Sequence, residues 1–195
     1  EEGGPAIADI LFGDENPGGK LPITFPRSVG QVPIFYNAKP SGMKSNWYVD
    51  YVAEKVTPLY AFGHGLSYTL FEYGELSIDQ KQAKVGESVD ISLEVRNVGK
   101  VMGDEVVQLY IRDEYASMPR PIKELKGYQR VNLMPNEEQT ITFHLPVDQL
   151  AFYDADLKLC VEAGKIHVML GSSSEDIRLR GEFEITGAKK AFVKD

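Results

Sequence analysis

Histidines and a lone cysteine are the residues that could bind a metal or act as nucleophiles in this chain of 195 residues. The three histidines, His64, His144 and His167, are isolated, and none has a second ligand at helical i, i+4 spacing. His144 and His167 take the polar positions of alternating segments, which predicts surface strand residues. His64 lies between two glycines in "FGHG", which indicates an unusual backbone and a structural role. Cys160 has no partner for an internal disulfide, and its strand-like context predicts a buried side chain.

Carboxylates are numerous, but no pair of them stands out. Hydrolysis by two carboxyl groups needs them roughly 5–10 Å apart across the bond that is cleaved. Asp104 and Glu105 open a predicted strand, Asp154 and Asp156 lie in a predicted turn, and "DEN" at 14–16 lies in another. We interpret all of them as solvated turn chemistry. "GDENPGGK" also lacks the spacing of a phosphate-binding loop. The sequence therefore predicts no catalytic residue, no metal site and no cofactor.

One aromatic cluster could bind a ligand. In "KPSGMKSNWYVDYV", the rings of Trp47, Tyr48 and Tyr51 alternate with lysine, asparagine and aspartate side chains in a polar loop over residues 39–51. A flat ring can stack on a sugar while neighbouring polar groups bind its hydroxyls, and loops often carry function. The alternative is that these rings pack the loop onto a neighbouring domain. We name the three aromatics as candidate substrate-binding residues and keep both interpretations.

Charge and composition exclude several classes of partner. The net charge of −8 argues against binding to nucleic acid or to an anionic membrane surface, since both need clustered lysine and arginine. No stretch approaches the ~20 apolar residues of a membrane-spanning helix. Apolar residues make up 43% of the chain, which is enough for a core.

The first 71 residues have too little regular structure to form a core of their own. "GPAIADILFG" predicts one helix, with Ile7, Ile10 and Leu11 on one face and Gly13 at its end. "KLPITF" predicts one short edge strand between two prolines. The long irregular stretch that follows is uncommon inside a compact domain. We infer that this half packs on another polypeptide segment.

Residues 72–186 alternate between apolar and polar positions in short runs with turn signals between them. This pattern predicts about seven strands, the number in an immunoglobulin-like sandwich of two sheets. Residues 187–195 are expected to be a tail. The residues predicted to face inward are Val89, Ile91, Leu93, Val95, Val107, Leu109, Ile111, Ile141, Phe143, Leu145, Ile166, Val168 and Leu170.

A long series of motifs resembles one known family. "AIADILFGDENPGGKLPITFPRSVGQVPIFYN", "PLYAFGHGLSYTLFEY", "PIKELKGYQRVNLMPNEEQTITFHLP" and "GKIHVMLGSSS" resemble the C-terminal part of family 3 glycoside hydrolases, of the β-glucosidase and β-xylosidase type. The likeness runs over residues 1–186, with one departure at Ala61, where such enzymes usually carry proline. It implies that residues 1–71 are the last helix, edge strand and linker of an α/β sandwich domain, and that residues 72–186 are a fibronectin type III-like domain.

The resemblance also implies a function. The two catalytic carboxylates of the family would lie upstream of Glu1, so none is assigned here. The chain would be the non-catalytic C-terminal portion of a retaining exo-β-glycosidase that removes terminal β-linked glucose or xylose, and it would be inactive alone. Its partners would be the upstream domains of the same enzyme, and an exposed helix face and edge strand would also permit a homo-oligomer. The alternatives are an autonomous fibronectin-like binding or adhesion module, and a carbohydrate-binding module built on Trp47 and the tyrosines.

Overall fold

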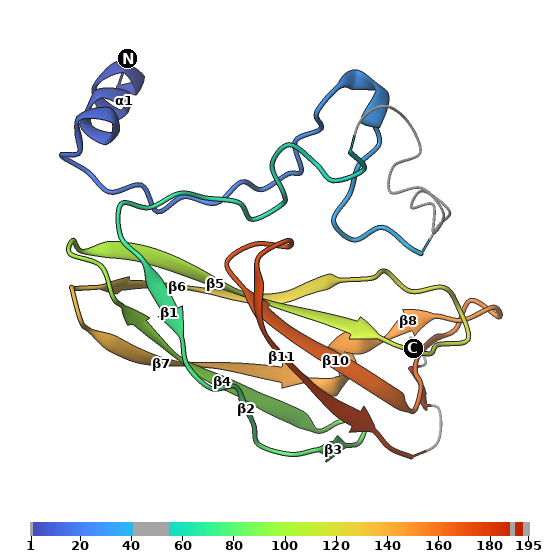
Figure 1. Ribbon diagram of the computed structural model, residues 1–195. Coiled ribbons are helices and arrows are strands. Elements are labelled where there is room, and N and C mark those ends of the chain that lie inside the picture. Colours follow the sequence, from blue (N-terminus) through green and yellow to red (C-terminus); the bar gives the residue numbers. More distant parts are fainter. Residues whose placement is uncertain (1, 41–54, 188–189, 193–195) are drawn as a thin grey trace.

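The structure, a computed structural model, describes residues 2–40, 55–187 and 190–192 of the chain. Two β-sheets face each other in a sandwich, and an N-terminal arm lies beside it (Figure 1). The arm comprises the described residues up to Leu70, and it contains one α-helix and one short 3-10 helix, α1 (Gly3–Phe12) and η1 (Val29–Gln31). No helix in these ranges is long and apolar enough to cross a membrane.

The first sheet is built around β4 (Ser88–Asn97). The strand β7 (Glu138–Pro146) pairs with it along residues 88–96, and all pairings in this sheet are antiparallel. Two shorter strands, β1 (Phe71–Tyr73) and β2 (Ser77–Ile78), also pair with β4, at residues 95–97 and 91–92. Runs of two or three residues carry too little alternation for the sequence to predict them.

The second sheet has five strands, and its pairings are antiparallel except for the parallel pair of its first two. In spatial order these are β3 (Gln82–Ala83), β11 (Ile177–Ile185), β10 (Gly164–Gly171), β5 (Gly103–Asp113) and β6 (Glu124–Leu133). A small third sheet follows the short helix η2 (Val147–Leu150), in the order β12 (Lys190–Phe192), β9 (Leu159–Val161) and β8 (Phe152–Tyr153).

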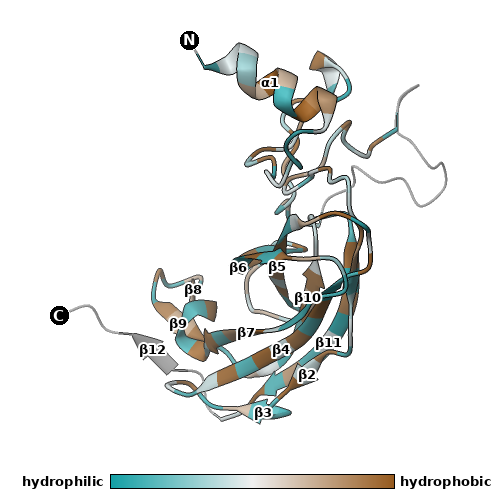
Figure 2. Cartoon of the chain, turned by 90° about the vertical axis from the view of Figure 1, so that its left-hand side faces the viewer, coloured by the Kyte–Doolittle hydropathy of each residue, from teal (hydrophilic) through white to brown (hydrophobic). Residues whose placement is uncertain are grey.

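The core lies between the two large sheets and confirms the predicted alternation. Every residue that the pattern places inward is buried, from Val89 on β4 to Leu170 on β10. Figure 2 shows the alternation as brown and teal bands along β4. Cys160 is also fully buried, as its context predicts. Because successive side chains of a strand point to opposite faces, one apolar set per strand is enough to fill the space between the sheets.

The helix α1 forms as predicted but stands away from the sandwich (Figures 1 and 2). It ends at Gly13, whose φ of 85° lies in the left-handed region and whose N–H donates to the Ile10 carbonyl at 3.2 Å. No residue of the helix is buried, and its large apolar side chains are open to solvent, with Leu11 72% and Phe12 85% exposed. An amphipathic helix normally buries its apolar stripe, so this face has no partner among the described residues.

Two segments differ from expectation. The edge strand expected over residues 20–25 is reduced to a single bridge between Phe25 and Tyr60, since Pro22 has no N–H to donate to a longer ladder. Part of the expected tail is ordered, because β12 pairs with β9 through Lys190–Phe192. The sequence gives no alternation there, and a three-residue strand is below the length that a pattern can reveal.

Candidate functional site

The arm meets the sandwich at a joint built from aromatic rings. The ring of Tyr36 stacks on that of Phe62, with centroids 4.2 Å apart and an angle of 19° between the planes. Its edge meets the ring of Tyr110 on β5, with centroids 5.8 Å apart. Stacked and edge-to-face pairs of this kind contribute about 0.5–1.5 kcal/mol each beyond the area they bury. Tyr110 is fully buried on the outer face of its sheet because the arm covers it.

A buried amide connects the joint to two backbones. The side chain of Gln108 on β5 is 3% exposed, and its Nε2 donates to the carbonyls of Ser172 at 2.7 Å and of Gly63 at 3.3 Å. Its Oε1 accepts from the Tyr110 hydroxyl at 2.5 Å. The N–H of Ser174 donates to the Phe62 carbonyl at 2.9 Å, so the loop after β10 is bonded to the same stretch of the arm. Buried polar groups of this kind cost free energy unless they are all paired, so the network fixes the position of the arm.

Gly63 is fitted to that amide. Its φ is 79°, and a Cβ added to it would lie 2.1 Å from Oε1 of Gln108. Both the left-handed backbone and the close approach require glycine at this position. The first glycine of "FGHG" is therefore required by the structure.

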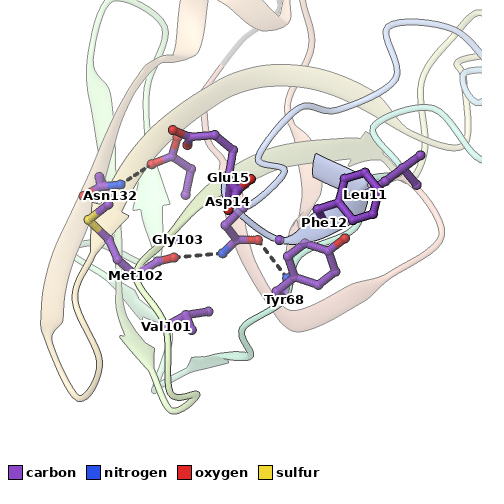
Figure 3. Close-up of a pocket in the computed structure, with 12 residues that line it drawn as sticks. Leu11, Phe12, Asp14, Glu15, Tyr68, Val101, Met102, Gly103 and Asn132 are labelled. Carbon is purple, nitrogen blue, oxygen red and sulfur yellow. Dashed lines mark hydrogen bonds between the residues drawn. The ribbon is translucent and has the colours of Figure 1, made fainter. Parts of the chain in front are cut away.

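A second set of contacts fixes the turn after α1 to the sandwich. Nδ2 of Asn16 donates to the Met102 carbonyl at 2.9 Å, and Oδ1 accepts from the N–H of Tyr68 at 2.8 Å (Figure 3). The Tyr68 hydroxyl donates to the carbonyl of Ile10 at 2.7 Å. The interpretation of Asn16 as a solvated turn residue is therefore wrong, since its amide bridges the arm and the turn that precedes β5.

An open cavity of about 570 Å³ lies beside these bonds, between the end of α1 and the start of β5. Figure 3 shows Phe12, Val101 and Asn132 around it, and Asp14, Glu15 and Asp104 also line it. Burial by itself would raise the pKa of Asp104, but hydrogen bonds from Asn132 and Arg130 hold that pKa below its ordinary value. Because Asp104 stays ionised, it cannot donate a proton as a general acid near neutral pH.

Glu105, at the start of β5, is part of a buried charged cluster rather than a solvated turn, so the sequence interpretation is wrong. It is 4% exposed and lies 3.0 Å from Nζ of Lys20 on the arm. Burial, together with the negative charge of Glu105, raises the pKa of the nearby Tyr73 hydroxyl. The guanidinium of Arg178 lies 4.6 Å from the centroid of the Tyr73 ring and bonds to Asp176 at 2.8 Å. The Lys20–Glu105 pair joins the arm to β5, and the Arg178 contact joins β11 to β1.

The three histidines occupy structural positions. The ring of His64 stacks on that of Tyr60, with centroids 5.2 Å apart, and its carbonyl accepts from the N–H of Leu21 at 2.8 Å. His144 bonds to Asp90 at 2.6 Å on an exposed strand face. His167 lies 3.1 Å from Glu114. Among the described residues, no group of three or more histidine, cysteine, aspartate or glutamate side chains is arranged to hold a metal ion.

Of the remaining residues that the sequence analysis singled out, Asp154 is described by the structure and the three loop aromatics are not. Asp154 is 7% exposed, and its Oδ1 accepts from the N–H groups of Asp156 and Lys158 at 3.0 Å, so it organises a turn without being solvated. Trp47, Tyr48 and Tyr51 lie outside the described residues. Their role as substrate-binding residues stays a prediction.

The sequence interpretation missed Gln108 and Tyr36. A signal for Gln108 exists, because "VVQLYI" places one polar residue inside a continuous apolar run. A strand that is apolar on both faces is covered on both, and a lone amide within it must find buried partners. Tyr36 carries no comparable signal, since its partners lie 26 and more residues away in the chain.

Comparison with known proteins assigns the chain to a family. Residues 1–68 match the model of the glycosyl hydrolase family 3 C-terminal domain, and residues 105–174 match that of the fibronectin type III-like domain. The chain belongs to glycoside hydrolase family 3. It corresponds to the C-terminal part of the β-glucosidases and β-xylosidases of this family, as its motifs suggest.

Curated relatives and solved structures agree with that assignment. A periplasmic β-glucosidase of Salmonella typhimurium is 43% identical over 190 residues, which cover 94% of this chain and 25% of that protein. A β-xylosidase of Formosa agariphila is 46% identical over 172 residues, which cover 88% and 24%. The structure of a β-glucosidase from Erythrobacter marinus matches with a TM-score of 0.86 at 46% identity and covers 94% of this chain and 24% of that one. This family 3 chain thus spans about a quarter of the length of the relatives it matches.

We expect Gly63→Ala to destabilise the chain more than Gly86→Ala. Both glycines have a left-handed backbone, but a Cβ at Gly86 meets nothing within 4 Å, whereas one at Gly63 collides with the amide of Gln108. Gly86→Ala should cost about 1–2 kcal/mol of unfolding free energy from its backbone alone. Gly63→Ala should cost clearly more, measured by urea denaturation. Equal losses in the two variants would show that the contact with Gln108 does not constrain the arm.

We also expect Asp113 to make the stability of the chain depend on pH. Burial raises the pKa of Asp113 to about 6, aided by Glu162 and Glu124 and opposed by the positive charge of Arg120. The folded state therefore binds a proton more tightly than the unfolded state, so the free energy of unfolding falls as pH rises from about 4 to 6. Asp113→Asn should remove this fall and stabilise the chain at pH 7 by about 1 kcal/mol, a value reduced for solvent screening. Thermal unfolding of both proteins at pH 4.5 and 7 tests this, and a variant that is less stable at pH 7 would contradict it.

Proposed function

We propose that this chain is the non-catalytic C-terminal portion of a retaining exo-β-glycosidase that removes terminal β-linked glucose or xylose. Its role is to complete the catalytic domains and to brace them. The observation that carries the proposal is the unpartnered apolar face of the arm. Ile7, Leu11 and Phe12 of α1 are 61%, 72% and 85% exposed, and Phe35 and Leu66 elsewhere in the arm are also exposed. Exposed apolar side chains in this number on one segment are typical of a surface that another polypeptide covers.

The occupant of that face is the upstream part of the same enzyme. The chain spans about a quarter of the length of its relatives, so most of each relative lies outside the matched region. In this proposal, residues 1–71 are the end of an α/β sandwich domain with its linker, residues 72–186 are the fibronectin type III-like domain, and residues 187–195 follow it. The polar joint supports this division of roles, because it fixes the arm to the sandwich while leaving α1 open.

The carboxylates described beside α1 favour a non-catalytic role for that cavity. Asp104 is held ionised by Arg130 and Asn132, and Glu105 is buried against Lys20. Glycoside hydrolysis needs one carboxyl group that donates a proton and a second that attacks or activates water. Asp104, which lines the cavity beside α1, does not suit the proton-donating role, since its pKa is lowered and not raised.

Turnover tests the proposal directly. The purified chain should not hydrolyse aryl β-glucosides or β-xylosides, whereas co-expression with the upstream part of its own polypeptide should restore hydrolysis of one of them. The upstream part alone is the control, and it should be inactive or unstable. Hydrolysis by the chain alone would place a catalytic site in these residues and overturn the proposal.

The apolar face makes a second prediction. Leu11→Asp should change the melting temperature of the 195-residue chain little, because the side chain is already 72% exposed. In a protein that includes the upstream part, the same change should cost about 2–4 kcal/mol, since it buries an unpaired charge. Asp9→Ala on the opposite side of α1 is the matched control and should be neutral in both proteins. A neutral Leu11→Asp in the longer protein would exclude α1 from the interface.

A further inference from the structure

A second cavity, of about 490 Å³, lies where the arm, the 114–123 loop and β8 meet. Its size falls in the range of about 300–1,000 Å³ that is usual for small-molecule sites. The residues that line it and bear on its chemistry are Tyr36, Asn37, Lys39, Arg120, Glu124 and Tyr153. It is separate from the cavity beside α1, with which it shares no lining residue.

The walls of this cavity are held in place before any ligand binds. The ring of Tyr36 is stacked on Phe62 and meets the edge of Tyr110. The N–H of Ile122 donates to the Ala38 carbonyl at 3.0 Å, so the loop is bonded to the arm next to the lining residues Asn37 and Lys39. A site whose walls are already ordered binds with a smaller entropic cost.

The arginine that lines the cavity is already paired with a carboxylate. Nη2 of Arg120 bonds to Oε1 of Glu124 at 2.7 Å, and Nζ of Lys126 lies 3.0 Å from the other oxygen of Glu124. The guanidinium of Arg120 also lies 4.7 Å from the centroid of the buried Phe152 ring. A phosphate or polyanion site presents several free cationic groups. Here Arg120 and Lys126 share Glu124, which leaves Lys39 as the only other cation among the described lining residues. The cavity therefore favours a neutral ligand.

The remaining lining groups suit a polyhydroxylated ligand with apolar faces. Tyr153 on β8 is 55% exposed and offers the face of an aromatic ring, with a hydroxyl at its end. Asn37 and Lys39 are exposed and bring an amide and an ammonium group to the same cavity. The paired Arg120 and Glu124 place donors and acceptors side by side, which is what adjacent hydroxyls require.

We propose that this cavity binds a neutral β-linked oligosaccharide of glucose or xylose, with Tyr153 as its stacking platform. The choice of sugar and linkage rests on the proposed function, whereas the site itself rests on the geometry above. No residue of the 39–51 aromatic cluster beyond Lys39 enters the proposal. The site would let the non-catalytic portion of the enzyme hold a substrate chain.

Titration calorimetry of the 195-residue chain with cellotetraose and with xylotetraose tests this proposal. We expect one of the two to bind, and Tyr153→Ala to weaken that binding by about tenfold, equivalent to about 1.4 kcal/mol. Tyr153→Phe should retain most of the affinity, since it keeps the ring. Tyr128→Ala is the matched control, because Tyr128 is also an exposed tyrosine, 69% against 55% for Tyr153, and lies on β6 without lining the cavity.

Three results would overturn the proposal: no binding of either tetrasaccharide, equal losses in the Tyr153→Ala and Tyr128→Ala variants, or equal binding of maltotetraose, whose linkages are α. Melting temperatures of the variants show whether a loss of binding comes from unfolding. If Tyr153→Ala unfolds, Tyr153→Phe still tests the proposal, because it keeps the ring and should retain most of the affinity. Failure here is distinguishable from failure of the proposed function. Restored turnover without tetrasaccharide binding would reject the cavity alone, whereas binding without turnover on co-expression would reject the enzymatic role.

Discussion

The buried amide of Gln108 is the interaction on which the arrangement of the arm and the sandwich depends. It lies on the outer face of β5 and reaches the carbonyls of Gly63 and Ser172, while the Tyr110 hydroxyl donates to it. If the arm moved away, these groups would lose their partners, and each buried polar group left unpaired costs about 1–3 kcal/mol. Apolar packing tolerates small shifts, but hydrogen bonds with fixed directions do not. The arm is therefore held in one position.

This constraint explains an unusual distribution of side chains in the arm. Its polar groups, such as Asn16 and Lys20, point to the sandwich and are paired there. Its apolar groups, such as Leu11 and Phe12, are exposed. A segment that only linked two domains would need neither feature, since linkers are usually flexible or extended. In the proposed function the two features act together: the polar groups fix the arm to the sandwich, and the exposed apolar side of α1 packs against the preceding domain.

The sequence predicts the sandwich well because its information is local. Alternation along β4, β5, β7 and β10 is visible in each run of residues, and each inward position is buried. The joint is different, since its contacts join positions far apart in the chain. Asn16 bonds to Met102 across 86 residues, and Gln108 bonds to Gly63 across 45. The turn residues at 14–16 would be the same whether Asn16 faced solvent or bridged the arm and the sandwich. No local pattern therefore distinguishes a solvated asparagine from a bridging one. Only the fold reveals which polar residues become buried.

The ion pair of Lys20 and Glu105 shows why charge is used at this joint. With Glu105 4% exposed, desolvation of the two ions offsets much of their attraction, so the pair adds little net stability. The pair instead disfavours other positions of the arm. A position that separates Lys20 from Glu105 leaves the buried Glu105 carboxylate without its ionic partner, which costs about 3–5 kcal/mol. An apolar pair would permit the arm to slide along the sheet with small losses. In the proposed function, a brace that presents α1 to an upstream domain gains more from that restriction than from additional stability.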